Sequence, residues 1–259
     1  MSDIGVSGLA ISLLLVLVAI VLSLWKQLGL ERSIAWAATR AAVQLVAIGL
    51  LLKVLLEPGV SILWAWLWVA VMIVVASLTV RSRAPEVPGL LPLALLAFGC
   101  SAALTLGVLF GLGVFELNVR TLIPLAGLMV GNSLAATVLV GRRLVDELRD
   151  KRDEVEARLA LGQPSHEAAK PYVRAALRTA LIPQIETTKA TGIVFLPGAM
   201  VGLILAGVRP LDAVRVQVAV MYLILGSVAT TTAVVALGLS ARLFTADHRL
   251  VRLAPPAED

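Results

Sequence analysis

The sequence predicts an all-α, polytopic membrane protein, and three observations support this fold class. Hydrophobic residues make up 59% of the 259 residues and charged residues only 15%, whereas roughly a quarter of the residues of soluble domains are charged. The mean hydropathy is +0.95. The apolar residues gather into about seven runs, most of them near the length of about 20 residues with which a helix crosses a bilayer. We therefore expect one transmembrane domain over residues 1–259, multi-pass in the cell inner (plasma) membrane.

The expected spans follow one another closely along the chain. They are Ile4–Trp25, Ile34–Leu56, Val60–Val80, Leu90–Phe115, Thr121–Gly141, Thr191–Val208 and a segment within Leu211–Leu239. No basic region precedes the first run, so it is interpreted as a retained helix rather than a signal peptide. Trp64, Trp66 and Trp68 open the third run, as expected for rings at a membrane interface. The sixth run is short and is interrupted by Pro197.

The loop charges predict the orientation. Nearly all of the loop Lys and Arg residues lie in loops one, three and five. Examples are Lys26 in loop one and Arg81 in loop three, and loop five is a long charged insert at about residues 142–189. The tail adds Arg242. Because Lys and Arg accumulate in cytoplasmic loops, the N-terminus is expected outside and the C-terminus inside. The same rule accounts for the net charge of +5 without nucleic acid. The single cysteine, Cys100, excludes an intrachain disulfide.

The charged insert, about residues 142–189, predicts a cytoplasmic helical hairpin. Residues 142–161 contain no Gly or Pro and place opposite charges at helical spacing, such as Glu147 with Lys151 and Glu154 with Arg158. This helix is expected to continue the fifth span and to end at Gly162. A second helix should run from His166 to about Leu181, with Ser165 as its cap and Pro183 as its end. From the charges alone, the hairpin could equally be a solvated connection.

The run Glu156–Gly162, EARLALG, resembles the coupling loop of ABC-transporter permeases, which docks in a cleft of the ATPase subunit. Three further runs, GLMVGNSLAATVLVGRRL, ALIPQIETTKATGIVFLPGAMVGLILAG and PLDAVRVQVAVMYLILG, are similar to FetB-like (YbbM-type) iron exporters and the related plant aluminium-tolerance permeases. The resemblance implies that a short loop binds the ATPase. Its residues are Glu156, Ala157, Arg158, Leu159, Ala160, Leu161, Gly162 and Pro164.

This resemblance implies the partners. The chain has no GxxxxGK[ST] phosphate loop, so ATP and Mg are expected in a separate ABC ATPase, with no cofactor in this chain. Seven spans imply a homodimer in the lipid bilayer. No set of nucleophile, base and orienting group lies at one membrane depth, so an enzyme is not expected. Alternatives are an ABC permease for a non-metal solute such as a nucleotide sugar, an ATP-independent secondary transporter, or a membrane scaffold.

Polar and helix-breaking residues inside the spans are candidates for a translocation pathway. They are Arg40, Gln44, Met129, Asn132, Ser133, Thr137, Glu186, Lys189, Pro197 and Met200. Each has a structural alternative. Ser133 and Asn132 could serve helix packing, and Glu186 with Lys189, expected at the cytoplasmic entrance, could form a structural ion pair. Arg40 could have a partner on a neighbouring helix.

The substrate follows from the resemblance alone, which implies iron. The expected spans contain no His and no mid-membrane carboxylate, the usual ligands for Fe(II). Met129, Met200 and Met221 are soft donors, and scattered methionines in a membrane helix also serve packing. The sequence therefore leaves the metal ligands unknown.

Overall fold

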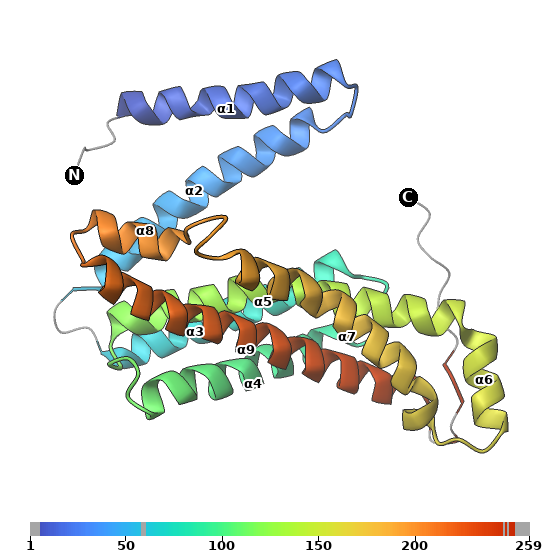
Figure 1. Ribbon diagram of the computed structural model, residues 1–259. Coiled ribbons are helices and arrows are strands. Elements are labelled where there is room, and N and C mark those ends of the chain that lie inside the picture. The colour runs from blue at the N-terminus through green and yellow to red at the C-terminus, as the bar shows by residue number, and fades with distance from the viewer. Residues whose placement is uncertain (1–5, 58–60, 246, 248, 252–259) are drawn as a thin grey trace. The chain divides into compact units, whose positions relative to one another are not determined.

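The computed structural model describes residues 6–57, 61–245, 247 and 249–251. These residues form nine α-helices and no β-strand (Figure 1). Their contacts divide the chain into two units, one up to Ser61 and one from Ile62 onward. Five helices are long and apolar enough to cross a membrane, and Ile11–Trp25 is a shorter apolar helical segment. The prediction of an all-α polytopic membrane protein is confirmed.

The first unit is a pair of helices, α1 (Val6–Trp25) and α2 (Glu31–Leu55). The chain reverses between them at Lys26–Leu30. Ser23 Oγ donates a 2.7 Å hydrogen bond to Glu31 Oε1 and accepts one of 3.2 Å from the Leu30 backbone N–H. This hydroxyl therefore fixes the turn from both sides.

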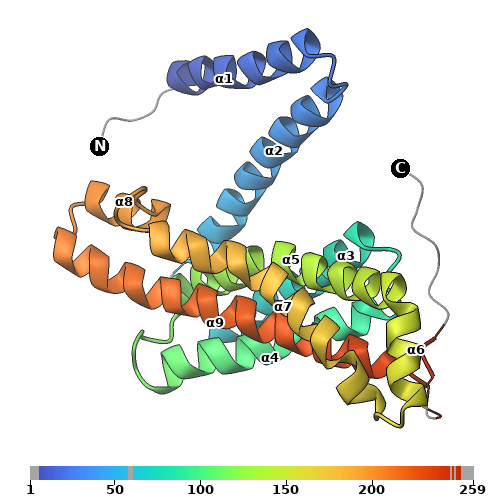
Figure 2. The ribbon, with the colours of Figure 1, turned by 45° about the vertical axis from the view of Figure 1, so that its right-hand side comes forward.

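The second unit is a bundle of five long helices (Figure 2): α3 (Ile62–Arg83), α4 (Leu90–Gly111), α5 (Val119–Asp150), α7 (Ser165–Ala190) and α9 (Pro210–Arg242). α5 packs against the four others, and α9 packs against α4, α5 and α7. The short α6 (Arg152–Ala160) lies at one end of the bundle, and α8 (Gly198–Leu205) lies beside α9 at the other end. Gly238 shows how closely α4 and α9 approach, because a Cβ atom there would lie 2.5 Å from Leu93 Cδ2.

Hydroxyl groups join the three central helices at mid-bundle. Ser133 Oγ on α5 donates to Ser227 Oγ on α9 at 3.1 Å, and Ser101 Oγ on α4 donates to the Ser227 carbonyl at 3.5 Å. All three serines are fully buried. Small residues allow helix backbones to approach in a bilayer, and hydroxyls can bond across the contact. We call Ser101, Ser133 and Ser227 the serine seam.

Most of the expected spans match helices, and one does not. The starts predicted at Ile4 and Val60 lie outside the described residues; within these limits the first to fifth and the seventh spans correspond to α1–α5 and α9. The predicted sixth span, Thr191–Val208, is wrong. Its residues form a turn and the eight-residue α8, which is about 12 Å long and cannot cross a layer of roughly 30 Å.

The helix that instead runs along α5 and α9 is α7, with 26 residues. It continues through Pro183, where the sequence predicted its end. Part of its polarity is masked, because four threonine hydroxyls donate to carbonyls one turn earlier. These are Thr179, Thr187 and Thr188 within α7 and Thr191 in its C-cap position.

The close packing of the serine seam can be tested by measuring stability. Ser133→Leu should lower the free energy of unfolding by about 1–3 kcal/mol, because it adds volume to a fully packed contact. Ser133→Ala, which only removes a hydrogen bond, should cost about 0.6 kcal/mol. Thermal unfolding in detergent measures both changes. The matched control is Ala103→Leu on the exposed face of α4, and a Ser133→Leu protein as stable as this control would contradict close packing at the seam.

Candidate functional site

The charged insert forms a hairpin of the end of α5, α6 and the start of α7. The single helix predicted over residues 142–161 is divided, because α5 ends at Asp150 and α6 begins at Arg152. Gly162 follows α6 with φ +84°, a left-handed conformation that favours glycine, and its predicted role as the end of the helix is confirmed. α7 starts at Ser165, with Pro164 rather than Ser165 in the capping position.

α6 is anchored on one side and exposed on the other. Val155 is fully buried, and α6 packs against α7 and the end of α5. The predicted pair Glu154–Arg158 is present at 3.0 Å, whereas Glu147 pairs with Arg143 at 2.5 Å rather than with Lys151. The predicted docking residues Ala157, Ala160, Leu161, Gly162 and Pro164 are exposed, and Leu161 reaches 84% exposure. The hairpin therefore presents an apolar tip on a fixed base.

Charge and burial reinforce the base of α6. The hydrogen bond from Arg158 is the main cause that lowers the pKa of the Glu154 carboxyl, and the nearby Tyr172 hydroxyl is the second. Burial raises the pKa of Tyr172 on α7, and the negative charge of Glu154 adds to the effect. The ion pair with Arg158 therefore favours the charged form of Glu154 on the exposed side of α6.

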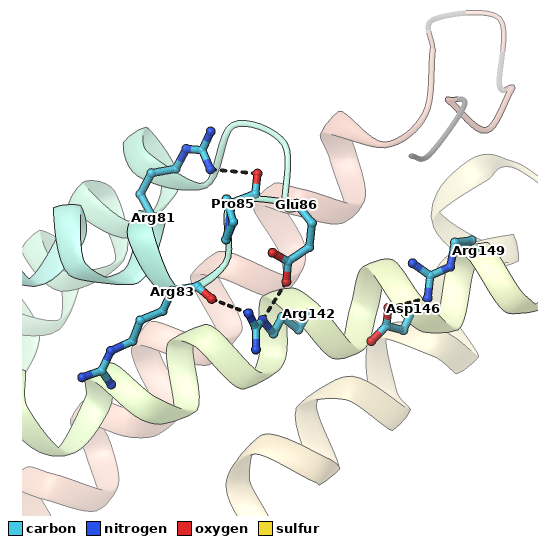
Figure 3. A network of polar contacts seen from close by, with 7 residues as sticks. All are labelled: Arg81, Arg83, Pro85, Glu86, Arg142, Asp146 and Arg149. Carbon is cyan, nitrogen blue, oxygen red and sulfur yellow. Dashed lines mark hydrogen bonds and ion pairs between the residues drawn. The ribbon is translucent and has the colours of Figure 1, made fainter. Parts of the chain in front are cut away.

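Arginines also secure the neighbouring loop between α3 and α4 (Figure 3). Arg142 on α5 forms an ion pair of 2.6 Å with Glu86 and donates to the Arg83 carbonyl at the end of α3. From α9, Arg242 donates to the Gly89 carbonyl at 3.0 Å. The end of the bundle that carries α6 is therefore rich in arginine, and several of these side chains cross from one element to another.

A cavity of about 380 Å³ lies at the opposite end of the bundle, among α7, α8 and α9. Its lining is mainly apolar, with an amide, hydroxyls and two thioethers, and comprises Thr188, Thr191, Gly192, Leu196, Pro197, Met200, Val214, Gln217, Val218, Met221 and Tyr222. Gln217 is only 5% exposed, and its Oε1 has no hydrogen-bond partner within the described chain. A buried amide oxygen without a partner is costly, so this position is suited to a ligand.

The predicted pathway residues do not share one location. Met129, Ser133 and Thr137 are fully buried inside the bundle. Asn132 is exposed on another face of α5, and its amide donates to the Leu128 carbonyl at 2.7 Å. Met129 and Asn132, which the sequence placed on one face, therefore point in different directions.

The other pathway candidates lie on α7, at the cavity and in the first unit. Glu186 and Lys189 form a 2.8 Å ion pair on the exposed side of α7, about 30 Å along the helix from Ser165. They therefore lie toward the cavity end of the bundle, away from α6. The sequence predicted them at a cytoplasmic entrance, on the same side as α6. Pro197 and Met200 line the cavity. Arg40 and Gln44 are exposed on α2.

Gln217 was missed as a candidate. Its signal is present in the sequence, because it is an uncharged polar residue within the apolar run of α9, and polar groups inside spans are candidates for function. Met221 lies one turn further along the same helix. Only the fold brings both residues together with Met200 and Thr188.

A bundle of apolar helices with a charged hairpin at one end and a partly polar cavity at the other is the architecture of a multi-pass membrane permease. A family model described as "Uncharacterised protein family (UPF0014)" matches residues 6–244, and the chain belongs to this family of membrane proteins.

Named relatives include two from plants and one from a bacterium. The chain is 36% identical over 212 residues to "UPF0014 membrane protein STAR2" of Oryza sativa, covering 82% of this chain and 74% of the rice protein. It is 34% identical over 220 residues to "Protein ALUMINUM SENSITIVE 3" of Arabidopsis thaliana, covering 84% and 80%. It is 30% identical over 244 residues to "Probable iron export permease protein FetB" of Escherichia coli, covering 94% of both chains. No solved structure matches the chain.

The hairpin geometry predicts the effect of changing Gly162. Gly162→Val should loosen the hairpin, because a β-branched residue at positive φ costs about 1–2 kcal/mol, although there is open space around the position. Limited proteolysis of the purified protein should show faster cleavage between α6 and α7. Gly162→Asn is the control, because Asn tolerates the left-handed conformation. Equal cleavage of the valine and asparagine variants would contradict this account.

Proposed function

We propose that this protein is the permease subunit of an ATP-driven ABC transporter that exports a metal ion, with iron as the first candidate. The observation that carries the proposal is α6, a short helix anchored by Val155 whose exposed tip carries Leu161. A separate ATPase can move membrane helices only through a rigid element docked on it. The run from Glu156 to Gly162, which resembles the family coupling loop, supplies that element. ATP and Mg are bound by the partner, because the chain carries no phosphate loop.

The charge distribution supports the orientation. The α6 end of the second unit carries many arginines, among them Arg142, Arg149 and Arg242, whereas the cavity end carries few, such as Arg209 and Arg215, which both pair with Asp212. Since Lys and Arg favour the cytoplasmic side, the α6 end faces the cytoplasm and the cavity end faces outward. The inner (plasma) membrane is then the expected location, and the ATPase meets α6 from the cytoplasm.

The cavity is the proposed passage for the substrate at the outer end. Gln217 offers an amide oxygen, Thr188 and Thr191 offer hydroxyls, and Met200 and Met221 offer thioethers. Neutral oxygen and thioether donors together suit a borderline or soft cation better than Mg²⁺ or Ca²⁺, which take oxygen ligands. Conduction also requires binding weak enough for release. The FetB relative is a probable iron export permease by name, which makes iron the candidate.

A second copy of the chain is part of the proposal. Asn132, Glu186 and Lys189 are exposed on α5 and α7, and polar groups at membrane depth normally face protein or a water-filled cavity rather than lipid. A homodimer, as the two-fold symmetry of paired ATPases requires, would cover these polar groups.

The coupling role is tested by purification with the partner. Tagged protein extracted from native membranes should carry an ABC ATPase subunit, identified by mass spectrometry. Leu161→Glu should weaken this association about thirtyfold or more, because it places a charge at a central apolar anchor. The matched control is Leu211→Glu, which alters a similarly exposed leucine, 75% exposed, at the other end of the bundle. If no ATPase accompanies the wild-type protein, the proposed function is wrong.

The cavity is tested by metal-stimulated ATP hydrolysis of the reconstituted permease and ATPase. Fe²⁺ should stimulate hydrolysis, whereas Mg²⁺ above its nucleotide requirement and Ca²⁺ should not. Gln217→Leu and Met200→Leu should each weaken the stimulation by about tenfold, as expected when one polar contact to a ligand is lost. Met129→Leu is the control, since Met129 is buried in the bundle and volume-conserving swaps are well tolerated. Stimulation lost equally in all three variants would argue against a site at the cavity.

A further inference from the structure

The chain beyond α9 turns back on itself next to α6. The Thr245 N–H donates to the Arg249 carbonyl at 2.9 Å, and the Val251 N–H donates to the Leu243 carbonyl at 2.9 Å. Phe244 and Leu250 form an antiparallel bridge. Leu243 and Leu250 are buried, with exposures of 1% and 5%. We call the described residues of this segment, 243–245, 247 and 249–251, the C-terminal turn.

Arg152, the first residue of α6, binds this turn. Its guanidinium donates to the Leu250 carbonyl at 3.3 Å and to the Val251 carbonyl at 3.5 Å. On its other side, Nε pairs with Glu156 Oε1 at 2.6 Å. Arg152, Glu156 and Leu159 of α6 and Arg249 and Leu250 of the turn also line a common cavity of about 340 Å³.

These contacts give α6 a third connection. The chain itself joins α6 to α5 through Lys151 and to α7 through residues 161–164. Arg152 adds a link to α9, because the C-terminal turn follows α9 directly. A guanidinium holds several acceptors in a fixed planar arrangement, which a lysine ammonium cannot reproduce. The link is therefore directional as well as attractive.

α9 leads from this link to the cavity. It is one helix of 33 residues, about 50 Å long, and Gln217, Val218 and Met221 of its first half line the cavity at the far end. An element that moves the last turn of α9 therefore moves the cavity wall as part of the same rigid helix.

We propose that Arg152 and the C-terminal turn transmit displacement of α6 by the ATPase to α9, and so to the cavity. This inference rests on the proposed function. Arg152 is a positioning residue on this account, since it binds neither nucleotide nor substrate. Its side chain instead couples the docking helix to the helix that carries Gln217.

The experiment uses the full-length protein with the ATPase that co-purifies with it, in proteoliposomes. Hydrogen exchange of residues 214–222 is measured without nucleotide and after trapping with ATP and vanadate. In the wild type, trapping should change the exchange of this segment. Arg152→Ala should reduce the change about tenfold, as expected for loss of an interaction that couples two sites, and Arg152→Lys should retain only part of it.

Two controls separate transmission from stability. Arg149→Ala removes another arginine, which pairs with Asp146 rather than with the C-terminal turn, and should behave as the wild type. A chain ending at Arg242 lacks the turn and should reproduce the loss with Arg152 intact. Both Arg152 variants and the shortened chain should still bind the ATPase at wild-type stoichiometry, whereas a purely structural defect would lower this stoichiometry.

The outcomes distinguish the two proposals. If the Arg152 variants or the shortened chain bind the ATPase and keep the nucleotide-dependent change at residues 214–222, the transmission role is overturned and the proposed function stands. If Arg152→Ala fails to assemble, the shortened chain decides by the same measurement. If the wild-type protein has no ATPase partner, the proposed function itself fails.

Discussion

The contact between α5 and α9 is the one on which the second unit depends, because every other long helix of the bundle packs against one or both of them. The serine seam is at its centre, and it joins the helices through small side chains and hydroxyls rather than charges. In a bilayer there is little hydrophobic gain from bringing apolar helices together, so close packing and interhelical hydrogen bonds provide the attraction. A rigid centre of this kind allows the two ends of the bundle to carry different chemistry, arginine-rich at α6 and mainly apolar at the cavity.

Much of the fold could be predicted because hydropathy is a local property. Six of the seven expected spans correspond to helices, and the continuation of the fifth span as a helix was also correct up to Asp150. The wrong prediction for residues 191–208 arises because burial by neighbouring helices is not a local property. That run is apolar but folds as a turn and a short helix, whereas α7, with Arg174, Arg178, Glu186 and Lys189 among its residues, is buried along one side by α5 and α9. Burial of this kind comes from neighbouring helices, which no window of a single sequence contains.

The candidate site could be predicted only in part for a related reason. The hairpin is a continuous segment, so Gly162 and the exposed Leu161 could be identified from the sequence and the family resemblance. The cavity is assembled from three helices, and no local sequence pattern indicates that Gln217 and Met221 meet Met200. Helical spacing on α5 was applied too broadly, because Asn132, three residues after Met129, is exposed, whereas Ser133, four residues after it, is buried.

The composition of α7 has a consequence for how the protein is made. Charged residues near the middle of a helix disfavour its insertion by about 2.5–3.5 kcal/mol each, so α7 enters lipid poorly by itself. Its apolar side, with Val173, Ala176 and Ala180, is buried only when α5 and α9 are both in place. Since α9 is synthesised last among the helices, the bundle cannot assemble strictly in the order of the chain. The apolar side of α7 is therefore covered only after α9 has been synthesised, which makes biogenesis of this protein dependent on its final fifty residues or so.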